Sequence, residues 1–434
     1  MLILSYLGLF VGLSLLVIMT MRGIGIIVSA IVCALVVALT SEMNLGDAML
    51  NYYMKGFTGF FTTWFPAILL GAIFGRLMDD SGAALSIANK TKQVLGAKRA
   101  IMAVVGAGAI LTYGGVSVFV VGFTLYPIAF ELFRSANIAH RFIPAAIIFG
   151  SISFTMVSPG SPEIQNLIPT TYFGTTATAG GIIGLLMALL IMVSGGFALR
   201  FMANRATANG ENFDLPADYG EEAVSKESLV SFLSAIVPLI ILVGGFNLLS
   251  HYISVIEALL AAMLSSLLIG YVLFRKTIEA PGKMISVGSE NALIAISNTC
   301  AVVGFGAVAA QSPAFANIVA FLTDMPGLEY AGLAVAVTVI AGITGSASGG
   351  LGIALPILAP IYQGMGLDNG AMHRISSIAS GGLDSLPHNG YVVTTIRAIC
   401  KETHQRAYPA AFVVSVLIPL PVLAIAVLLY SYFA

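Results

Sequence analysis

The sequence Val-Ser-Pro-Gly-Ser-Pro-Glu-Ile-Gln-Asn, residues 157–166, is polar and breaks helices, yet apolar sequence flanks it on both sides. In hydrocarbon every backbone N–H and C=O needs a partner, so irregular backbone persists there only where protein encloses it or where it lines a cavity. We therefore expect this stretch to form part of a binding site. Three other stretches share its character: Thr-Tyr-Gly-Gly-Val-Ser at 112–117, Thr-Gly-Ser-Ala-Ser-Gly-Gly at 344–350 and Asp-Ser-Leu-Pro-His-Asn-Gly at 384–390.

The composition around these stretches is that of an integral membrane protein. Hydrophobic residues make up 58% of the chain and charged residues only 9%, whereas a soluble domain has about 25% charged residues. Many segments reach the ~20 apolar residues that span a bilayer as a helix, which favours a helical bundle over a barrel. The net charge of −1 predicts no nucleic-acid partner, and Cys33, Cys300 and Cys400 have no spacing typical of disulfides or zinc. We expect no metal and no cofactor, and we interpret 2–20 as a retained first helix.

Twelve apolar segments are divided six and six by one long hydrophilic stretch, Arg200 to Ser228. A shift of 231 residues superposes the halves, with Phe74-Gly75 on Phe305-Gly306 and Gly114 on Gly345. This pattern predicts two repeats, 1–200 and 229–434, joined by a linker at 201–228; coincidental matches in membrane helices are the alternative. The segments are 2–20, 24–40, 58–78, 99–133, 142–173, 176–199, 229–249, 254–274, 291–310, 331–363, 373–399 and 408–433.

Segments 99–133 and 331–363 are each interrupted and too short to cross twice. The arm 99–112 has 14 residues, which makes only about 21 Å of helix. Each is therefore predicted to be a re-entrant hairpin.

The distribution of basic residues supports this topology through the positive-inside rule. With two hairpins, ten crossings and an outside N-terminus, 17 of the 19 Lys and Arg residues are cytoplasmic, and only Lys55 and Arg374 lie outside. If all twelve segments crossed, the 19 basic residues would divide 9 to 10 between the two sides of the membrane, which is no bias. Five crossings and one hairpin per half place the second half upside down. The expected fold is thus an all-α integral membrane protein of two inverted repeats, with broken helices at the binding site and both termini outside.

The hairpin tips and broken helices bring four helix N-termini to one cavity, and such ends bind anions through free N–H groups. Ser161-Pro162-Glu163 has the pattern of an N-cap followed by an N1 proline, and Ser117, Ser348 and Ser385 are candidates for the same capping role. No Lys or Arg lies within the breaks, so a small monocarboxylate is favoured over a multiply charged anion. The expected substrate-binding residues are Thr112, Tyr113, Gly114, Gly115, Ser117, Ser158, Gly160, Ser161, Gln165, Asn166, Thr344, Ser346, Ser348, Ser385 and Asn389.

Three ionisable residues occur at the breaks: Glu163, Asp384 and His388. Ionisable groups at membrane depth are costly and usually functional. We expect them to bind the coupling ion, with Asp384 as the first choice. Proton uptake together with the anion is one possibility; sodium coordination by a carboxylate and freed backbone carbonyls is the other.

The sequence contains the motifs Tyr113-Gly114-Gly115-Val116-Ser117, Tyr126-Pro127, Pro159-Gly160-Ser161-Pro162-Glu163-Ile164-Gln165-Asn166-Leu167-Ile168-Pro169-Thr170 and Tyr172-Phe173-Gly174-Thr175. These motifs resemble the gluconate permease (GntP) family of the ion transporter superfamily. The resemblance implies proton-coupled uptake of hydroxy-monocarboxylates, a homodimer and an elevator-like motion. Two features depart from the gluconate members, which carry glutamine at the position of Glu163 and Gly-Phe-Trp after the Asp-Ser of the second break. The substrate therefore stays open among gluconate, 3-hydroxybutyrate, lactate and glycerate.

These observations together predict a proton-coupled symporter for a small hydroxylated monocarboxylate in a bacterial cytoplasmic membrane. The transport parts are expected at 99–200 and 331–434 and the scaffold at 1–78 and 229–310. A sodium-coupled symporter, a cation/proton antiporter and a channel are the alternatives. No HExxH or GxSxG motif occurs, so we expect no enzyme activity.

Overall fold

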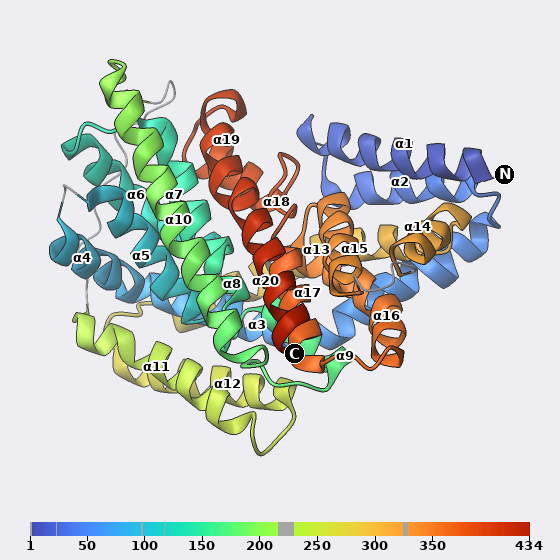
Figure 1. Ribbon diagram of the computed structural model, residues 1–434. Helices are drawn as coiled ribbons and strands as arrows, with labels where there is room; N and C mark the ends of the chain where they lie inside the picture. Colours follow the sequence, from blue (N-terminus) through green and yellow to red (C-terminus); the bar gives the residue numbers. More distant parts are fainter. Residues whose placement is uncertain (1, 23, 97–98, 117, 216–229, 324–328) are drawn as a thin grey trace.

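The computed structural model describes residues 2–22, 24–96, 99–116, 118–215, 230–323 and 329–434, and within these ranges the secondary structure is entirely helical (Figure 1). In the first half the helices are α1 (Leu2–Met21), α2 (Ile26–Thr40), η1 (Asp47–Tyr53), α3 (Met54–Asp80), α4 (Ala83–Leu95), α5 (Ala100–Tyr113), α6 (Val118–Ser135), η3 (His140–Phe142), α7 (Ile143–Ile152), α8 (Phe154–Val157), α9 (Ile164–Phe173) and α10 (Gly181–Ala208). In the second half they are α11 (Phe232–Leu249), α12 (Val255–Phe274), α13 (Pro281–Ala309), α14 (Pro313–Thr323), α15 (Glu329–Thr344), α16 (Ala347–Gly364), α17 (Asn369–Ser380), α18 (Gly390–Val393), η4 (Thr394–Ile399), α19 (His404–Phe412), η5 (Val413–Leu417) and α20 (Pro419–Phe433).

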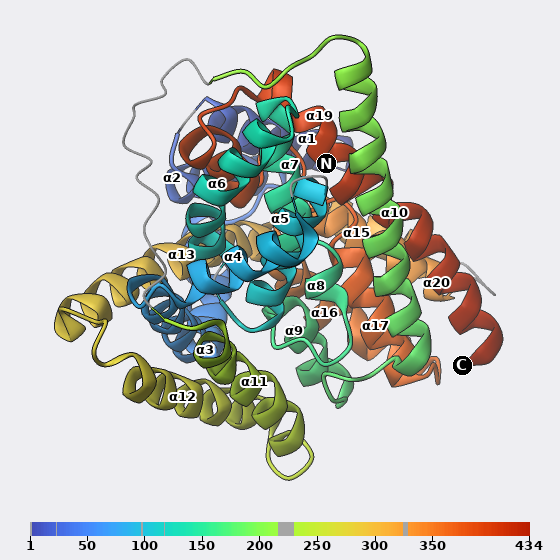
Figure 2. The same cartoon turned by 90° about the vertical axis from the view of Figure 1, so that its left-hand side faces the viewer.

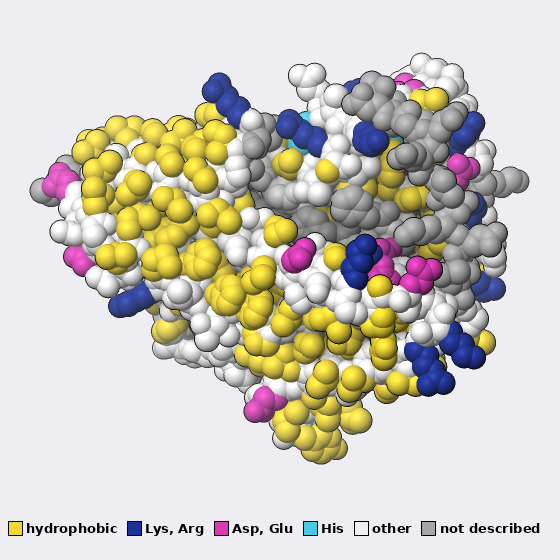
Figure 3. Space-filling model, turned by 180° about the vertical axis from the view of Figure 1, so that it is seen from behind, with side chains coloured by type: hydrophobic (Ala, Val, Ile, Leu, Met, Phe, Trp, Pro, Cys, Tyr) yellow, Lys and Arg dark blue, Asp and Glu magenta, His cyan; other side chains and the backbone are white. Residues whose placement is uncertain are grey.

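Seven described stretches are long and apolar enough to cross a membrane. Much of the described surface is correspondingly hydrophobic, and Lys and Arg lie mostly toward the margins of the face that Figure 3 shows. The other three of the ten expected crossings fall on the helix α1, the helix α2 and the segment from α17 to η4. The seven stretches are Asp47–Asp80, His140–Val157, Gly181–Ala208, Phe232–Leu249, Val255–Phe274, Pro281–Ala309 and His404–Phe433.

Both predicted interruptions of the hairpin segments are present. The arms α5 and α6 pack on each other around the turn that follows Tyr113, and α15 and α16 do the same around Gly345 and Ser346. Both predicted broken segments are present as well. Irregular backbone at 158–163 separates α8 from α9, and irregular backbone at 381–389 separates α17 from α18.

The helices form two packed groups. In one group α3 packs against α12 and α13, α11 against α12, α2 against α13, and α1 against α2. The other group consists of the hairpins and broken segments, and here the two halves of the chain interlock: α16 and α17 pack against α9, and α6 packs against η4. Helices α10 and α20 run side by side along this group (Figures 1 and 2).

Two helices were missed by the sequence analysis, α4 and α14. Neither is long enough to cross a bilayer, and α4 is amphipathic, with Ala84, Ile87 and Ala88 buried and Lys90 exposed. A search for apolar segments passes over such helices, whereas the helical spacing of their apolar residues would have found them. Helix α10 also continues to Ala208, eight residues into the expected linker.

Candidate functional site

The first break is fixed by contacts from three parts of the chain. Gly160 adopts a left-handed conformation (φ +80°), which glycine reaches without strain. Its N–H donates to the Ala177 carbonyl at 2.9 Å, and its carbonyl accepts from Nδ2 of Asn247 on α11 at 2.9 Å. The hydroxyl of Tyr113, at the first hairpin tip, donates to the Pro159 carbonyl at 3.0 Å. The hairpin tip, α11 and the loop before α10 thus satisfy the backbone that the break leaves without helical partners.

Asn166 is fully buried and braces the same region. Its Nδ2 donates to the carbonyls of Ser161 (2.8 Å) and Ala177 (2.9 Å), and its Oδ1 lies 3.3 Å from Nε2 of His373. Nδ1 of His373 lies 2.7 Å from the Thr175 hydroxyl. The side chain of Asn166, expected to bind substrate, therefore already has protein partners at both its amide nitrogen and its oxygen.

Arg374 is a basic residue near the first break that the sequence analysis did not include in the site. It is fully buried on α17. Its guanidinium donates to the carbonyls of Val157, Ala177 and Ala179, so it joins the end of α8 to the loop that precedes α10. No Lys or Arg occurs within the first break itself, but a buried cation lies against its first residue, Val157.

The helix starts at the breaks differ from the predicted caps. Helix α9 begins at Ile164 with Glu163 at the N-cap position, and the Ser161 hydroxyl instead accepts from the Glu163 N–H at 3.3 Å. In the second half the capping side chains are Ser346, which accepts from the Gly349 N–H, and Asn389, which accepts from the Val392 N–H. Ser348 and Ser385 are therefore not caps, because neither position begins its helix. Ser117 lies outside the described residues.

The second break contains a buried acidic group. Asp384 is 3% exposed, and its Oδ1 accepts from the Ser385 hydroxyl at 2.8 Å. Nδ2 of Asn389 donates to the Asp384 carbonyl, and Tyr408 on α19 donates to the Ser385 carbonyl. Within the described part of the chain no ion pair includes Asp384, so its burial is compensated by hydrogen bonds alone.

The second hairpin tip packs directly on the second break. A Cβ added at Gly345 would lie 2.4 Å from Cδ2 of His388, which leaves room only for glycine at this left-handed position (φ +58°). His388 itself is 4% exposed. Hairpin tip and break therefore meet in both halves: Tyr113 with Pro159, and Gly345 with His388.

The two broken segments also touch each other. The hydroxyls of Ser151 on α7 and Tyr391 on α18 lie 2.8 Å apart, and the Ser377 hydroxyl on α17 is 3.3 Å from the Gln165 carbonyl. A Cβ at Gly381 would lie 2.8 Å from Cε of Met156. No hydrogen bond joins the tips of the two hairpins among the residues that the structure describes. The structure thus brings the two breaks together and leaves each tip on the break of its own half.

Glu163 projects from the end of the first break. The residue is partly exposed, but its Oε1 is enclosed and has no hydrogen-bond partner in the part of the chain that the structure describes. Enclosed acceptors normally have a donor, so this oxygen is open to a proton or a ligand.

A cavity of about 640 Å³ lies beside the first hairpin tip and the first break. Tyr113, Gly114 and Ser158, three of the expected site residues, line it together with Thr155. The remaining wall is apolar and comes from α5, α8, α10 and α11: Ala109, Ile110, Phe154, Leu185, Ala188, Leu189, Met192, Ile236, Leu239, Ile240, Val243 and Gly244. The volume suits a small organic molecule.

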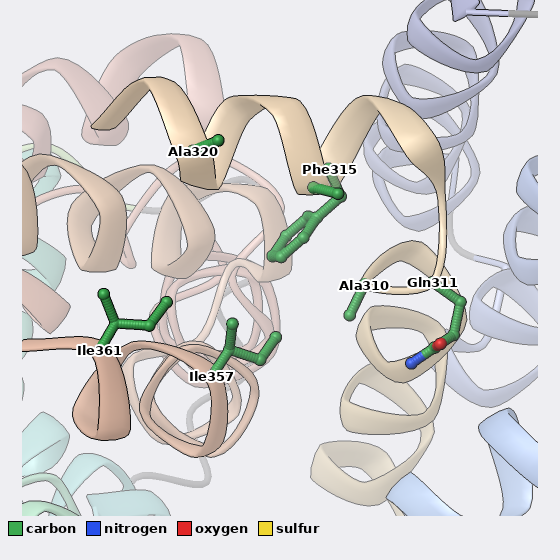
Figure 4. A pocket seen from close by; sticks show the side chains of 7 residues that line it. Ala310, Gln311, Phe315, Ala320, Ile357 and Ile361 are labelled. Carbon is green, nitrogen blue, oxygen red and sulfur yellow. The ribbon is translucent and has the colours of Figure 1, made fainter. Parts of the chain in front are cut away.

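A second cavity, of about 410 Å³, lies between α14 and α16, and none of the expected site residues lines it. In Figure 4 the side chains of Phe315, Ile357 and Ile361 point into it. Gln311 supplies the one amide of this lining. The cavity therefore has little to orient a polar substrate.

Several expected substrate ligands use their polar groups within the protein. The hydroxyl of Thr112 donates to the Gly108 carbonyl, that of Ser158 to the Phe154 carbonyl, and that of Thr344 approaches the carbonyls of Ala341 and Ser346. Gly115, at φ +85°, is limited by Leu242 of α11, which would lie 2.8 Å from an added Cβ. Close packing on α11 therefore accounts for this glycine without a ligand.

A buried histidine–glutamate pair joins the halves of the chain away from the breaks. Nδ1 of His140 lies 2.9 Å from Oε1 of Glu402, and its Nε2 lies 3.1 Å from the Tyr126 hydroxyl. The next residue along the chain after His140, Arg141, binds Glu211 through two hydrogen bonds, which hold the pKa of the Glu211 carboxyl below its usual value. The start of the linker is thus attached to the ends of α6 and α7.

The comparisons with known proteins agree with this architecture. The model of the GntP family permeases matches residues 2–388. Two similar curated proteins are both described as uncharacterized transporters. YxjC of Bacillus subtilis is 35% identical over 97% of each chain, and a Haemophilus influenzae protein is 25% identical over 80% of each.

Two solved transporter structures share the fold at low sequence identity. The YdaH transporter of Alcanivorax borkumensis has a TM-score of 0.55 at 17% identity and covers 88% of each chain. MtrF of Neisseria gonorrhoeae, described as one of a class of antimetabolite efflux pumps, has a TM-score of 0.51 at 14% identity, over 89% of this chain and 84% of its own. At these identities the likeness concerns the fold alone.

Proposed function

This chain belongs to the GntP family of permeases, and on that premise we propose that it takes up a small hydroxylated monocarboxylate together with protons. The family confirms the resemblance read from the motifs, and it makes the chain an integral membrane transporter. The substrate, the coupling ion and the mechanism are the proposal. The proposal also includes the location: the bacterial cytoplasmic membrane, with both termini outside.

The observation that carries the proposal is the meeting of two broken membrane segments, each covered by a hairpin tip, beside a cavity of about 640 Å³. The N–H groups at the starts of α9 and α16 lack helical acceptors, so these ends favour an anion. Tyr113, Thr155 and Ser158 line the cavity with hydroxyl oxygens, which can accept hydrogen bonds from substrate hydroxyls.

Proton coupling is assigned to Asp384. A buried carboxyl without a cationic partner is costly to keep ionised, and an anion that arrives nearby raises that cost further. Proton and substrate then favour each other's binding, and the coupling is reciprocal. Glu163 and His388 are the other titratable groups at the breaks.

The proposed mechanism is an elevator motion. The group of α1–α3 and α11–α13 corresponds to the scaffold expected at 1–78 and 229–310, and the hairpins and broken segments correspond to the moving parts expected at 99–200 and 331–434. The helices follow the same order in both halves, from α1 to α10 and from α11 to α20, which supports the repeat. We propose that the repeats are inverted and that the scaffold forms a homodimer interface.

The test combines binding with transport. Purified protein is screened by thermal unfolding against gluconate, 3-hydroxybutyrate, lactate and glycerate, because a bound ligand stabilises the folded state by mass action. Uptake of the stabilising acid into proteoliposomes is then driven by a pH gradient or by a sodium gradient. Stabilisation and pH-driven accumulation are expected; stabilisation by none of the acids contradicts the substrate class. Uptake driven only by a sodium gradient would identify sodium as the coupling ion instead of the proton. Cation/proton exchange without any organic acid would identify the protein as an antiporter.

A further inference from the structure

Arg374 is a fully buried cation that the transport chemistry described so far does not use. Its guanidinium binds the carbonyls of Val157, Ala177 and Ala179. No carboxylate lies within 4.0 Å of it in the described part of the chain. Carbonyl dipoles satisfy its N–H groups but leave its formal charge uncancelled, and an unpaired buried charge costs several kcal/mol.

A short stretch of backbone links the guanidinium to the 640 Å³ cavity. Val157 gives its carbonyl to Arg374, Ser158 lines the cavity, and the Pro159 carbonyl accepts from Tyr113, which also lines the cavity. Residues 157–159 therefore contact both the cation and the lining of the cavity. Among the described residues that line the cavity, none has a charged side chain.

The chain is shaped to hold Arg374 in this position. A Cβ added at Gly180 would lie 2.4 Å from Cβ of Arg374, and one added at Gly184 would lie 2.9 Å from its Cδ. The hydroxyl of Tyr430 donates to the Gly180 carbonyl at 2.6 Å and fixes the same loop from α20. Helices α10, α17 and α20 thus fix the guanidinium against the end of α8.

We propose that Arg374 is a positioning residue that makes the cavity beside the first break selective for an anion, acting through residues 157–159 and not by contact. A bound carboxylate supplies the countercharge that the guanidinium lacks, and because the guanidinium is fully buried, their attraction is screened less than that of two exposed charges. The inference rests on the proposed function, because it requires an organic anion as substrate.

The experiment compares an acid with its uncharged amide on the full-length protein in detergent. Dissociation constants are measured for 3-hydroxybutyrate and 3-hydroxybutyramide, and for gluconate and gluconamide, by calorimetry. The native protein is expected to bind one of the acids more tightly than its amide. In Arg374→Gln this preference should fall at least tenfold, with the amide affinity little changed. Tyr430→Phe is the matched control, because it removes a hydrogen bond to the same loop without a change of charge, so it should keep the native preference.

Arg374→Lys separates the effect of the positive charge from that of the hydrogen bonds to the three carbonyls. It also provides a test if Arg374→Gln does not fold. Lysine keeps the charge but cannot bind three carbonyls in a planar fork, so it should lower the unfolding temperature and keep the preference for the acid. An unchanged preference in Arg374→Gln, or a parallel loss of acid and amide binding in Arg374→Lys, overturns the inference and leaves the proposed function standing. Failure of the native protein to bind either acid overturns both.

Discussion

At the scale of single residues, Asp384 is the group on which the proposed coupling depends. Asp384→Asn cannot bind or release a proton, while its amide still accepts the hydrogen bond from Ser385. Substrate exchange across proteoliposomes should therefore persist, whereas accumulation driven by a pH gradient should be lost. Accumulation at the native level in this variant would remove Asp384 from the role of proton carrier.

Gly160 provides a second prediction at this scale. Gly160→Ala places a Cβ 3.1 Å from Oδ1 of Asn247 and 3.3 Å from the Tyr113 hydroxyl, at a left-handed backbone position. The strain at this position is about 1–2 kcal/mol, and the added methyl also displaces the contacts of the break. Initial uptake rates should fall at least tenfold.

The matched control is Gly174→Ala. Gly174 is also left-handed (φ +63°), but an added Cβ would meet no atom of the described residues within 4 Å. It should therefore show the loss of stability without the loss of uptake, measured by thermal unfolding and transport in parallel. Equal loss of uptake in both variants would show that backbone strain alone, and not the geometry of the first break, accounts for the effect.

The residue scale is also where the sequence predicted least. The proline and glycine residues of 157–166 located the break, because no regular helix accommodates them. The roles of Asn166 and Arg374 depend on the carbonyls that fold against them, and these lie 5 to 217 residues away along the chain. The count of basic residues assigned Arg374 to a loop, because such a count contains no information about tertiary contacts. Asn247 was missed for a related reason: it lies in an apolar segment, where only a search for isolated polar residues would have singled it out.

At the scale of elements, the pair of His140 and Glu402 joins the start of the first broken segment to the end of the second. Glu402→Ala leaves His140 buried without its acceptor, which should lower the free energy of unfolding by about 1–3 kcal/mol. The measurement is thermal or denaturant unfolding in detergent. Glu211→Ala is the control, because its pair with Arg141 is exposed and should contribute less than about 1 kcal/mol. Equal losses in both variants would mean that the buried pair adds nothing beyond a surface ion pair.

Elements were predicted well where they are continuously apolar or sharply broken. Both hairpin turns and both breaks were placed correctly from Gly, Pro and Ser clusters. Helices α4 and α14 were not, because burial of one face needs only a few apolar residues, which a search for long apolar segments does not detect. The caps were misplaced by two to four residues, since Ser-Pro-Glu fits a helix start equally well two residues earlier.

At the scale of the whole molecule, an elevator motion changes the contacts between the hairpin group and α11. Ile110 on α5 and Ile236 on α11 line the same cavity from opposite groups. Cysteines at these two positions, in a chain whose native cysteines are replaced, should be joined by a short bifunctional thiol reagent in the state described here. The yield of this crosslink should change severalfold when substrate and a pH gradient are applied. A yield that is the same under all conditions would contradict relative motion of the two groups.

The predicted topology is tested by the two ends of the first hairpin. Exposed positions Gln93 on α4 and Ser135 at the end of α6 flank it. If the hairpin re-enters, cysteines at both positions should be labelled by an impermeant maleimide from the cytoplasmic side only. Labelling from opposite sides would turn the hairpin into a crossing and remove the inverted repeat.

The burial of Arg374 also bears on how the protein is made. The carbonyls of Val157, Ala177 and Ala179 are synthesised long before the arginine that binds them, and a charged side chain at membrane depth is unfavourable until it has partners. The arginine of the second half therefore enters the bilayer without the carbonyl partners that the first half supplies, and those carbonyls lack their donor until it arrives. Biogenesis should accordingly have a late docking step, in which newly inserted halves either unite or are degraded, and separately expressed halves should persist only when they are produced in the same cell.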